Sequence, residues 1–360
     1  MGIRMSEELA RLIDLDAVTL STLDDILSTA RVIRAKPGYY CDSCHGKILA
    51  TLFYEPSTRT QMSFQAAMLR LGGKVIGFDD PGASSVSKGE SLKDTVRVVS
   101  NYADILAIRH PKEGAAKAAS LYSCCPVINA GDGGHLHPTQ TLTDLFTLSE
   151  TRGRLDHLTV GVCGDLKNGR TVHSLVKTLR RFSGNRFVLI STPELTLPAY
   201  LLSAMEESNC PYTVSNSLID SIGGLDVLYM TRIQKERFAS TGEYERQKGV
   251  FVLDAEKLRH AKSELRILHP LPRVDEIDYE VDNDPRAVYF EQTEFGMYVR
   301  QALILHMLDG VKRGVPALPE RVSALCCANP ACITGSEKYL PPLFTFGTQF
   351  VCDYCDHGIE

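Results

Sequence analysis

From residue 47 onward, short apolar runs alternate with stretches in which apolar residues recur every three or four positions. The runs predict buried strands, and the periodic stretches, such as 58–71, predict helices that cover them. The strands predicted in the first half lie at 48–54, 74–78, 104–108 and 126–130. This alternation is typical of a parallel sheet with helices on both faces.

A helical pattern precedes this region, and a second alternation follows it. Residues 7–36 mix apolar and charged positions at helical spacing, and a helix predicted over 138–151 leads into the second half. The strands predicted there lie at 158–163, 187–190, 212–214, 226–230 and 267–268. An apolar helix is expected over Phe295–Leu308.

The fold that these patterns predict is α/β, with two doubly wound parallel-sheet domains, and the cysteine-rich C-terminus is expected to form a small separate β module. We place the first domain at 1–137 and the second at 138–294. The helix at 295–310 packs back on the first domain in this interpretation, and the module occupies 320–360.

Composition narrows the class of protein. The chain has 360 residues, of which 44% are hydrophobic and 23% charged, as in an ordinary globular protein. A net charge of -5 gives no general reason to expect nucleic acid as a partner. No apolar run is long enough for a membrane span, and the N-terminal stretch does not resemble a signal peptide. We therefore expect a cytoplasmic protein without a membrane partner.

The C-terminal segment carries a cysteine pattern. Five of the 11 cysteines fall after residue 325, including the pairs Cys327-x4-Cys332 and Cys352-x2-Cys355. Four thiolates in two close pairs are typical of a closed structural zinc site, and so short a module needs a metal to fold. Cys326 is the alternative to Cys327, although the spacing favours Cys327.

An earlier pair, Cys41 and Cys44, is followed by His45. The spacing fits covalent haem attachment, which requires export, or one half of a metal site with a distant partner. The third interpretation, a loop before the first core strand, is the one we favour.

The stretch Ser57-Thr58-Arg59-Thr60 lies where the first buried strand ends and a helix begins. A helix N-terminus offers N–H groups and a positive dipole end, and hydroxyls with a guanidinium add donors. The cluster therefore suits a phosphate. The alternative is a simple helix cap, which serine and threonine often provide.

Further polar clusters follow the other predicted strands. They comprise the loop 84–90 with Ser84 and Lys88, Arg109, and the segment carrying His137 and Gln140. In a parallel sheet these positions share the carboxyl edge, where ligands bind. Taken singly, the loop and the histidine have plain alternatives, an exposed loop and a structural histidine, as a surface position is the plain alternative for Arg170 and Arg232 in the second domain.

The second domain shows the same arrangement. Arg170 closes the turn GDLKNGR, Arg232 and Gln234 follow the strand at 226–230, and ILHPLPRVDEI spans 267–277. GDLKNG is not the G-x-G-x-x-G fingerprint, so a dinucleotide is not indicated.

Together, EPSTRT at 55–60, HPTQTLTDLFT at 137–147 and ILHPLPRVDEI at 267–277 resemble the aspartate and ornithine carbamoyltransferases. The resemblance covers about residues 7–312. His269-Pro270-Leu271-Pro272 stands where the ornithine enzymes carry a cysteine, so the aspartate carbamoyltransferase family is the better match.

This resemblance implies transfer of the carbamoyl group from carbamoyl phosphate to L-aspartate, an early step of pyrimidine (UMP) synthesis. The implied catalytic residues are Arg59, Thr60, Arg109 and His137. The implied carbamoyl phosphate ligands are Ser57, Thr58, Arg59, Thr60, Ser84, Lys88, Arg109, His137, Gln140, Pro270 and Leu271. The implied aspartate ligands are Lys88, Arg170, Arg232 and Gln234.

The family also implies a homotrimer in which the loop 84–90 serves the neighbouring subunit's site. The C-terminal cysteines resemble the zinc domain of the regulatory chain of the same enzymes, here fused in cis, and two roles stay open for it: joining trimers or bracing a single one. Gln61 departs from the STRTR form of the motif, and Thr293-Glu294-Phe295 departs from the smaller residues expected there. Two alternatives stay open: a carbamoyltransferase for another amino acid such as ornithine, and a non-catalytic assembly subunit.

Overall fold

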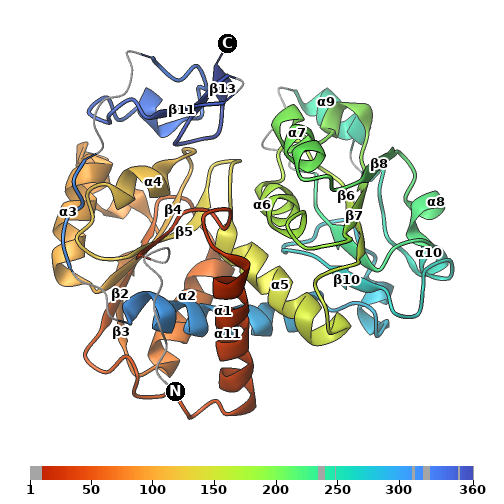
Figure 1. Cartoon of the computed structure of the whole chain (residues 1–360), viewed down its shortest axis with the longest axis horizontal. Coiled ribbons are helices and arrows are strands. Elements are labelled where there is room, and N and C mark those ends of the chain that lie inside the picture. Colours follow the sequence, from red (N-terminus) through yellow and green to blue (C-terminus); the bar gives the residue numbers. More distant parts are fainter. Residues whose placement is uncertain are drawn as a thin grey trace. The chain divides into compact units, whose positions relative to one another are not determined.

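A computed structural model describes residues 10–233, 240–247, 249–309, 313–318, 325–347 and 349–359. The chain divides into two compact units (Figure 1). The first consists of Met1–Thr139 with Met297–Glu360, and the second of Gln140–Gly296. Each is an α/β unit built on a parallel sheet, as the hydrophobic pattern predicts.

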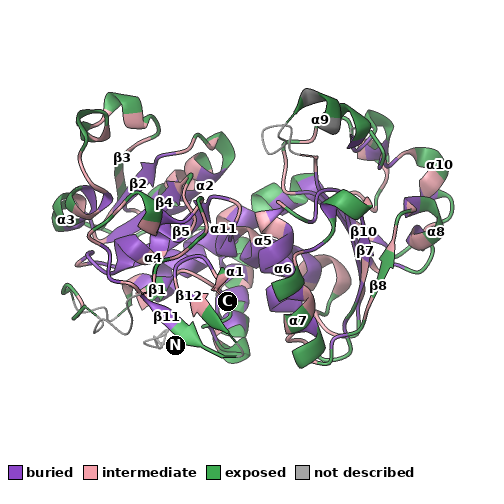
Figure 2. Ribbon diagram, turned by 90° about the horizontal axis from the view of Figure 1, so that it is seen from above, coloured by how far each residue is buried: buried purple, intermediate pink, exposed green. Residues whose placement is uncertain are grey.

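The first unit has a five-stranded sheet in the order β1-β5-β4-β2-β3. Its strands are β1 (Arg11–Leu12), β2 (Ile48–Phe53), β3 (Lys74–Phe78), β4 (Ile105–His110) and β5 (Val127–Asp132). Its first helices are α1 (Leu20–Ala35), α2 (Thr58–Arg70), α3 (Leu92–Tyr102) and α4 (Ala115–Ser120). The central strands are buried along almost their whole length (Figure 2), which explains their continuous apolar sequences.

The helix predicted over 7–36 is wrong at its start. Arg11–Leu12 instead form the short strand β1, which pairs with β5, and residues 7–9 lie outside the described part of the chain. The helix begins at Leu20 because Thr19 caps it, accepting a hydrogen bond from Thr22 N at 3.2 Å.

The second unit repeats the architecture, with its strands in the order β10-β9-β6-β7-β8. These are β6 (Thr159–Cys163), β7 (Arg186–Ile190), β8 (Tyr212–Ser215), β9 (Val227–Met230) and β10 (Arg266–Leu268). Its helices include α6 (Arg170–Leu179), α7 (Ala199–Glu207), α8 (Leu218–Ile222), α9 (Thr241–Gln247) and α10 (Ala255–Leu258). The strand positions predicted from the sequence are confirmed to within two residues.

Two helices belong to both units because the chain passes from one to the other within them. They are α5 (Pro138–Arg152) and α11 (Tyr289–Leu308). α11 begins six residues earlier than predicted, so Thr293 lies inside it, where its hydroxyl donates to Phe290 O at 2.7 Å. In the first unit, α11 bonds to α1 through His306 and Thr29 at 2.9 Å and to α2 through Arg300 and Ser63 at 3.1 Å.

The C-terminal segment 325–359, which we call the tail, belongs to the first unit. It carries an antiparallel sheet of β11 (Phe344–Phe346), β12 (Phe350–Cys352) and β13 (Gly358–Ile359). The tail shares a buried apolar cluster with α4, in which Ile333 and Tyr354 join Ala115 and Ala119. In Figure 1 it lies beside α4.

Candidate active site and metal centre

In each sheet the strand order reverses at one point, between β2 and β4 in the first unit and between β6 and β9 in the second. Ligands of open α/β sheets bind outside the carboxyl ends of the strands at such a point. All the predicted carbamoyl phosphate and aspartate ligands among the described residues lie at or after the carboxyl ends of these or neighbouring strands. The structure thus gathers them at one edge of each sheet.

Ser57-Thr58-Arg59-Thr60 forms the N-terminus of α2, directly after β2. Ser57 stands at the cap position, but its side chain makes no capping hydrogen bond. The first bond of the helix runs from Gln61 N to Ser57 O at 3.0 Å, so the N–H groups before Gln61 precede the helical ladder. Thr58 and Arg59 are exposed and Thr60 is buried. The uncapped end therefore presents donors to solvent, as an anion site requires.

Arg109 lies in β4, beside the end of β2. It pairs in register with Phe53, and its carbonyl accepts from Tyr54 N at 2.8 Å. The residue is only 8% exposed, and its guanidinium lies 3.4 Å from the carboxylate of Glu55. Glu55 was missed in the sequence analysis, although it directly precedes Pro56-Ser57. It supplies the negative charge that a buried guanidinium needs.

His137 ends the loop between β5 and α5. It is buried, and its Nδ1 lies 3.5 Å from the hydroxyl of Thr139. Asp132 at the start of this loop accepts from Gly114 N at 2.7 Å and from Leu136 N at 3.2 Å. The backbone leading into His137 is thus fixed by a buried carboxylate.

The loop with Ser84 and Lys88 folds into two 3-10 turns, η2 (Pro81–Ala83) and η3 (Ser85–Lys88). The hydroxyl of Ser84 donates to Pro81 O at 2.9 Å and accepts from Val86 N at 3.3 Å. Lys88 ends η3 and is exposed. The loop therefore has its own local order while its lysine faces solvent.

In the second unit, Arg170 opens α6 after β6, and Arg232 follows β9. Because β6 and β9 are neighbours, with Cys163 beside Met230, these arginines come from adjacent strand ends. Both are half-buried. Gln234 lies outside the described residues.

The segment 269–272 follows β10. His269 is buried, and its Nδ1 accepts from Leu271 N at 2.8 Å. Its other ring nitrogen therefore carries the proton and donates to Glu276 at 2.7 Å. Burial alone would raise the pKa of Glu276, but hydrogen bonds from the His269 ring and from Val274 N lower it. This pair holds the Pro270 and Leu271 carbonyls in place, with Leu271 at a φ of 52°.

A buried carboxylate, Asp144, joins that segment to Gln140. Gln140 Nε2 donates to Asp144 Oδ1 at 2.8 Å, and Gln292 Nε2 donates to the same atom at 2.6 Å. Gln292 Oε1 in turn accepts from His269 N at 3.1 Å. Because a carboxylate accepts and does not donate, both amides are oriented, and the Gln140 oxygen is turned away from Asp144. The sequence analysis missed Asp144, although it stands one helical turn after Gln140.

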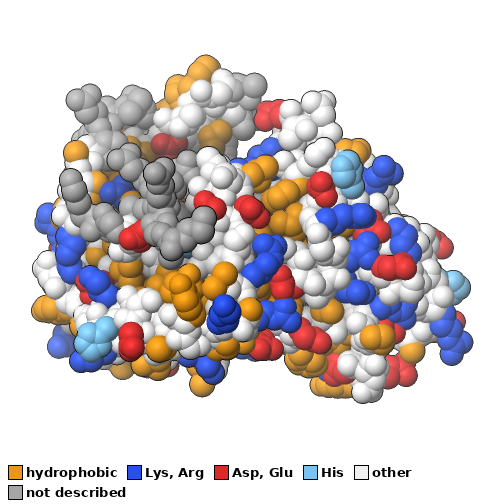
Figure 3. Space-filling view, turned by 60° about the horizontal axis from the view of Figure 1, so that its bottom comes forward, with side chains coloured by type: hydrophobic (Ala, Val, Ile, Leu, Met, Phe, Trp, Pro, Cys, Tyr) orange, Lys and Arg blue, Asp and Glu red, His pale blue; other side chains and the backbone are white. Residues whose placement is uncertain are grey.

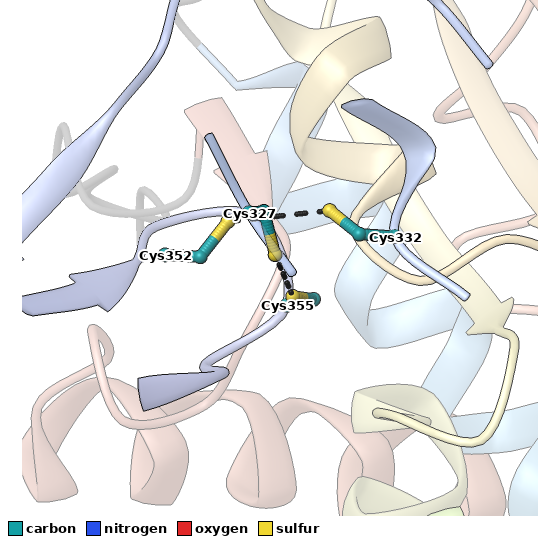
Figure 4. A group of neighbouring side chains, drawn as sticks. All are labelled: Cys327, Cys332, Cys352 and Cys355. Atoms are coloured by element: carbon teal, nitrogen blue, oxygen red, sulfur yellow. Dashed lines mark hydrogen bonds between the residues drawn. The ribbon is translucent and has the colours of Figure 1, made fainter. Parts of the chain in front are cut away.

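The four tail cysteines converge in the structure (Figure 4). The sulfur atoms of Cys327, Cys332, Cys352 and Cys355 all lie within 4.8 Å of one another. Two of the sulfur–sulfur distances are 3.6 Å, Cys327 to Cys355, and 4.0 Å, Cys332 to Cys352. A tetrahedral metal with bonds of about 2.3 Å to sulfur needs separations of about 3.8 Å. The cluster therefore fits such an ion, and hydrogen bonding from Cys352 lowers the pKa of Cys332.

Cys41 and Cys44 lie in turns between α1 and β2, as the loop interpretation predicts. Cys44 is buried and its N–H donates to Leu71 O at 2.8 Å, whereas Cys41 is exposed. Over the described part of the chain, the tail cysteines are the only group of three or more metal-ligating side chains close enough to share an ion.

Positive and negative side chains are interspersed over the described residues on the face drawn in Figure 3. Among the helices of the described residues, none is long and apolar enough to cross a membrane.

Two family models match the chain in succession. Residues 11–150 match the aspartate/ornithine carbamoyltransferase carbamoyl-P binding domain, and residues 156–307 match the Asp/Orn binding domain of the same enzymes. The aspartate carbamoyltransferase catalytic subunit of Clostridium perfringens is 58% identical over 298 residues, which are 82% of this chain and 97% of that protein.

Solved structures of aspartate transcarbamoylases also match this chain. The catalytic subunit of M. jannaschii aspartate transcarbamoylase is 47% identical with a TM-score of 0.78, covering 83% of this chain and 98% of that one. Aspartate transcarbamoylase from Trypanosoma cruzi in complex with carbamoyl phosphate and aspartate is 35% identical with a TM-score of 0.81, covering 85% and 99%.

Proposed function

The chain belongs to the aspartate/ornithine carbamoyltransferase family, and we propose that it transfers the carbamoyl group of carbamoyl phosphate to L-aspartate. The products are N-carbamoyl-L-aspartate and phosphate, as in pyrimidine synthesis. The observation that carries this proposal is the 58% identity to an aspartate carbamoyltransferase catalytic subunit across nearly its whole length.

Carbamoyl phosphate binding begins at the uncapped N-terminus of α2. We assign the phosphate to Ser57, Thr58, Arg59 and Thr60, where Arg59 can form two parallel hydrogen bonds to it. Ser84 and Lys88 add a hydroxyl and a compact charge. We assign these two to the site of a neighbouring subunit in a homotrimer, and this rests on the resemblance of the loop alone.

We assign activation of the carbamoyl carbonyl group to Arg109, His137 and Thr60. Attack by the amine builds negative charge on the carbonyl oxygen, and fixed donors aimed at it lower the barrier. Arg109 suits this role because its buried guanidinium is held by β4 and Glu55 before substrate arrives. No covalent intermediate is required, and the departing phosphate can take the amine proton.

The carbamoyl nitrogen needs acceptors rather than donors. The oriented amide oxygen of Gln140 and the carbonyls of Pro270 and Leu271 supply them. An acceptor set of this kind distinguishes a carbamoyl group from an acyl group that lacks N–H donors.

Aspartate presents two carboxylates, which we assign to Arg170 and Arg232, with Lys88 and Gln234 as further ligands. Two guanidiniums from adjacent strand ends suit a dicarboxylate, because each can form a bidentate pair. Ornithine, with a cationic side chain, would meet repulsion there.

The tail metal is zinc in this proposal, bound by Cys327, Cys332, Cys352 and Cys355. Its role is structural, since four protein ligands leave no open position for a substrate. We further propose that the tail corresponds to the zinc domain of the regulatory chain and that the enzyme is cytoplasmic.

The test is a product assay on the purified chain, with metal analysis on the same preparation. With carbamoyl phosphate, aspartate should give carbamoyl-aspartate while ornithine gives no carbamoyl product, and zinc should be present at about one ion per chain. Carbamoylation of ornithine instead would support the other-acceptor alternative. Substrate binding without any product would support a non-catalytic subunit.

A further inference from the structure

The tail contacts three segments of the first unit, and each adjoins a loop that carries a proposed site residue. The first is the N-terminus of α3, which directly follows the loop with Ser84 and Lys88. Leu92 N donates to Glu337 Oε1 at 3.2 Å, and Lys93 N donates to the hydroxyl of Tyr339 at 2.8 Å. The tail thus caps the helix on which that loop ends.

The second segment directly follows Arg109. Glu113 N donates to Ala331 O at 3.0 Å, and Ile333 N donates to Glu113 O at 2.9 Å. These bonds form a parallel bridge between Glu113 and Cys332, one of the four clustered cysteines. The backbone after Arg109 is therefore hydrogen-bonded directly to the segment of the tail that carries one of the clustered cysteines.

The third segment leads into His137. His135 is 6% exposed and lies between two carboxylates, 3.4 Å from Asp132 and 3.1 Å from Asp356 of the tail. Burial alone would lower the pKa of His135, but Asp132 and Asp356 raise it to about 10. Asp132 also accepts from Leu136 N, next to His137. Asp356, which follows Cys355, thus reaches the site loop through one charged histidine.

Close packing supports these bonds. At Gly114, an added Cβ would lie 2.5 Å from Tyr354 Cβ, so no side chain fits between the tail and this segment. The tail's own strands are two or three residues long, too short to hold a fold unaided. Its shape must depend on the metal and on this contact.

We propose that the tail is a positioning element for carbamoyl phosphate binding, holding from outside the loops that carry Lys88, Arg109 and His137. The inference rests on the proposed function and deepens it. Metal binding orders the tail, and the ordered tail restricts these loops to the arrangement that binds the substrate. Asp356 and His135 are positioning residues, since neither is assigned to the substrate.

The sharpest variant is Asp356→Asn. It keeps the size of the side chain and removes its charge, and asparagine tolerates the left-handed backbone at this position, where φ is 56°. Asp353→Asn is the matched control, because Asp353 accepts from the Thr345 hydroxyl at 2.8 Å inside the tail.

The full-length variants are compared by metal content, by Kd for carbamoyl phosphate and by hydrogen exchange over 132–137. Asp356→Asn should retain its metal, weaken carbamoyl phosphate binding about fivefold to tenfold and speed exchange over 132–137, as loss of a half-buried hydrogen bond to a charged group does. Asp353→Asn should match the wild type in all three.

Unchanged affinity and exchange in a metal-loaded Asp356→Asn protein would overturn the proposal. If that variant loses its metal, Tyr339→Phe decides instead, since it removes the hydroxyl that caps Lys93 N and hydrogen-bonds Glu337 and leaves the four cysteines in place. It should speed exchange over 84–93, and no change there would contradict the proposal. Exchange does not depend on the acceptor amino acid, so a failed aspartate assay with these shifts intact would reject the proposed function alone.

Discussion

The two units hold their site segments in different ways. In the second unit, the segment 269–272 is held from within, by the buried side chains of Glu276, Gln292 and Asp144. In the first unit, the segments next to Lys88, Arg109 and His137 are held from outside by the tail, through backbone bonds and one ion pair. The second unit's segment depends on that unit's own core, whereas the first unit's segments, besides contacts of their own through Glu55 and Asp132, depend on a docked tail with a cysteine cluster.

Because of this difference, we expect the two units to respond differently to amino-acid substitution and to removal of the metal. The hydrogen-bond network of the second unit should lose its order only when one of its residues is replaced. The contacts of the tail with the first unit should also be lost when the metal is removed. Chelation should therefore disturb the first unit's loops and leave the second unit's segment unchanged.

The largest effect is expected from Asp144→Ala. The change removes the one acceptor shared by Gln140 and Gln292, so the acceptors for the carbamoyl nitrogen lose their orientation. We expect kcat/KM for carbamoyl phosphate to fall about 100-fold, the scale of a small misplacement of reacting groups. Steady-state kinetics measures this, and circular dichroism checks the fold.

Asp144→Asn is the control, because its amide oxygen can still accept both hydrogen bonds, and its loss should be much smaller. If Asp144→Ala kept wild-type kinetics, the network would not orient the site. If chelation reproduced the Asp144→Ala effect in the wild type, the contrast between the two units would be wrong.

A smaller effect is expected from Glu276→Gln. The pKa of Glu276 is lowered in the folded protein, so its ionised form stabilises the fold. This contribution is fully present above the ordinary value of 4.5 and is lost as the pH falls through the lower folded value. The variant should lose about 2 kcal/mol of stability at pH 7.

Denaturant unfolding of both proteins at several pH values provides the measurement. The difference in unfolding free energy between wild type and variant should shrink as the pH falls below 4.5. Below that pH the carboxylate becomes protonated first in the unfolded protein and, at the lower folded pKa, in the folded protein as well. A difference that stays constant with pH would mean that the charge of Glu276 does not contribute.

Periodicity predicted both sheets because central parallel strands are apolar throughout and their helices are amphipathic. It failed at residues 11–12, where two residues pair with β5 through the backbone alone and leave no side-chain period to read. The positions of Arg59 and His137 after strands, and of Arg109 at the end of one, could be predicted from the hydrophobic pattern. His135 acts through Asp356, which it meets only in the fold, so spacing alone did not reveal it, whereas the spacing of Asp144 from Gln140 was readable and was missed.

The docking of the tail could not be predicted for the same reason. Its cysteine spacing predicted the cluster, because ligand pairs are local in sequence. Its bonds to Glu113 and His135 join residues more than 200 positions apart, and no local pattern carries such pairing.

The central claim is that one protein binds a phosphate with Arg59 and a dicarboxylate with Arg232. Calorimetric titration with N-phosphonacetyl-L-aspartate, which carries both groups, tests it most directly. The account predicts tight binding to the wild type and a loss of at least about 100-fold in each of Arg59→Ala and Arg232→Ala. Failure of the wild type to bind, or unchanged affinity in either variant, would contradict the account.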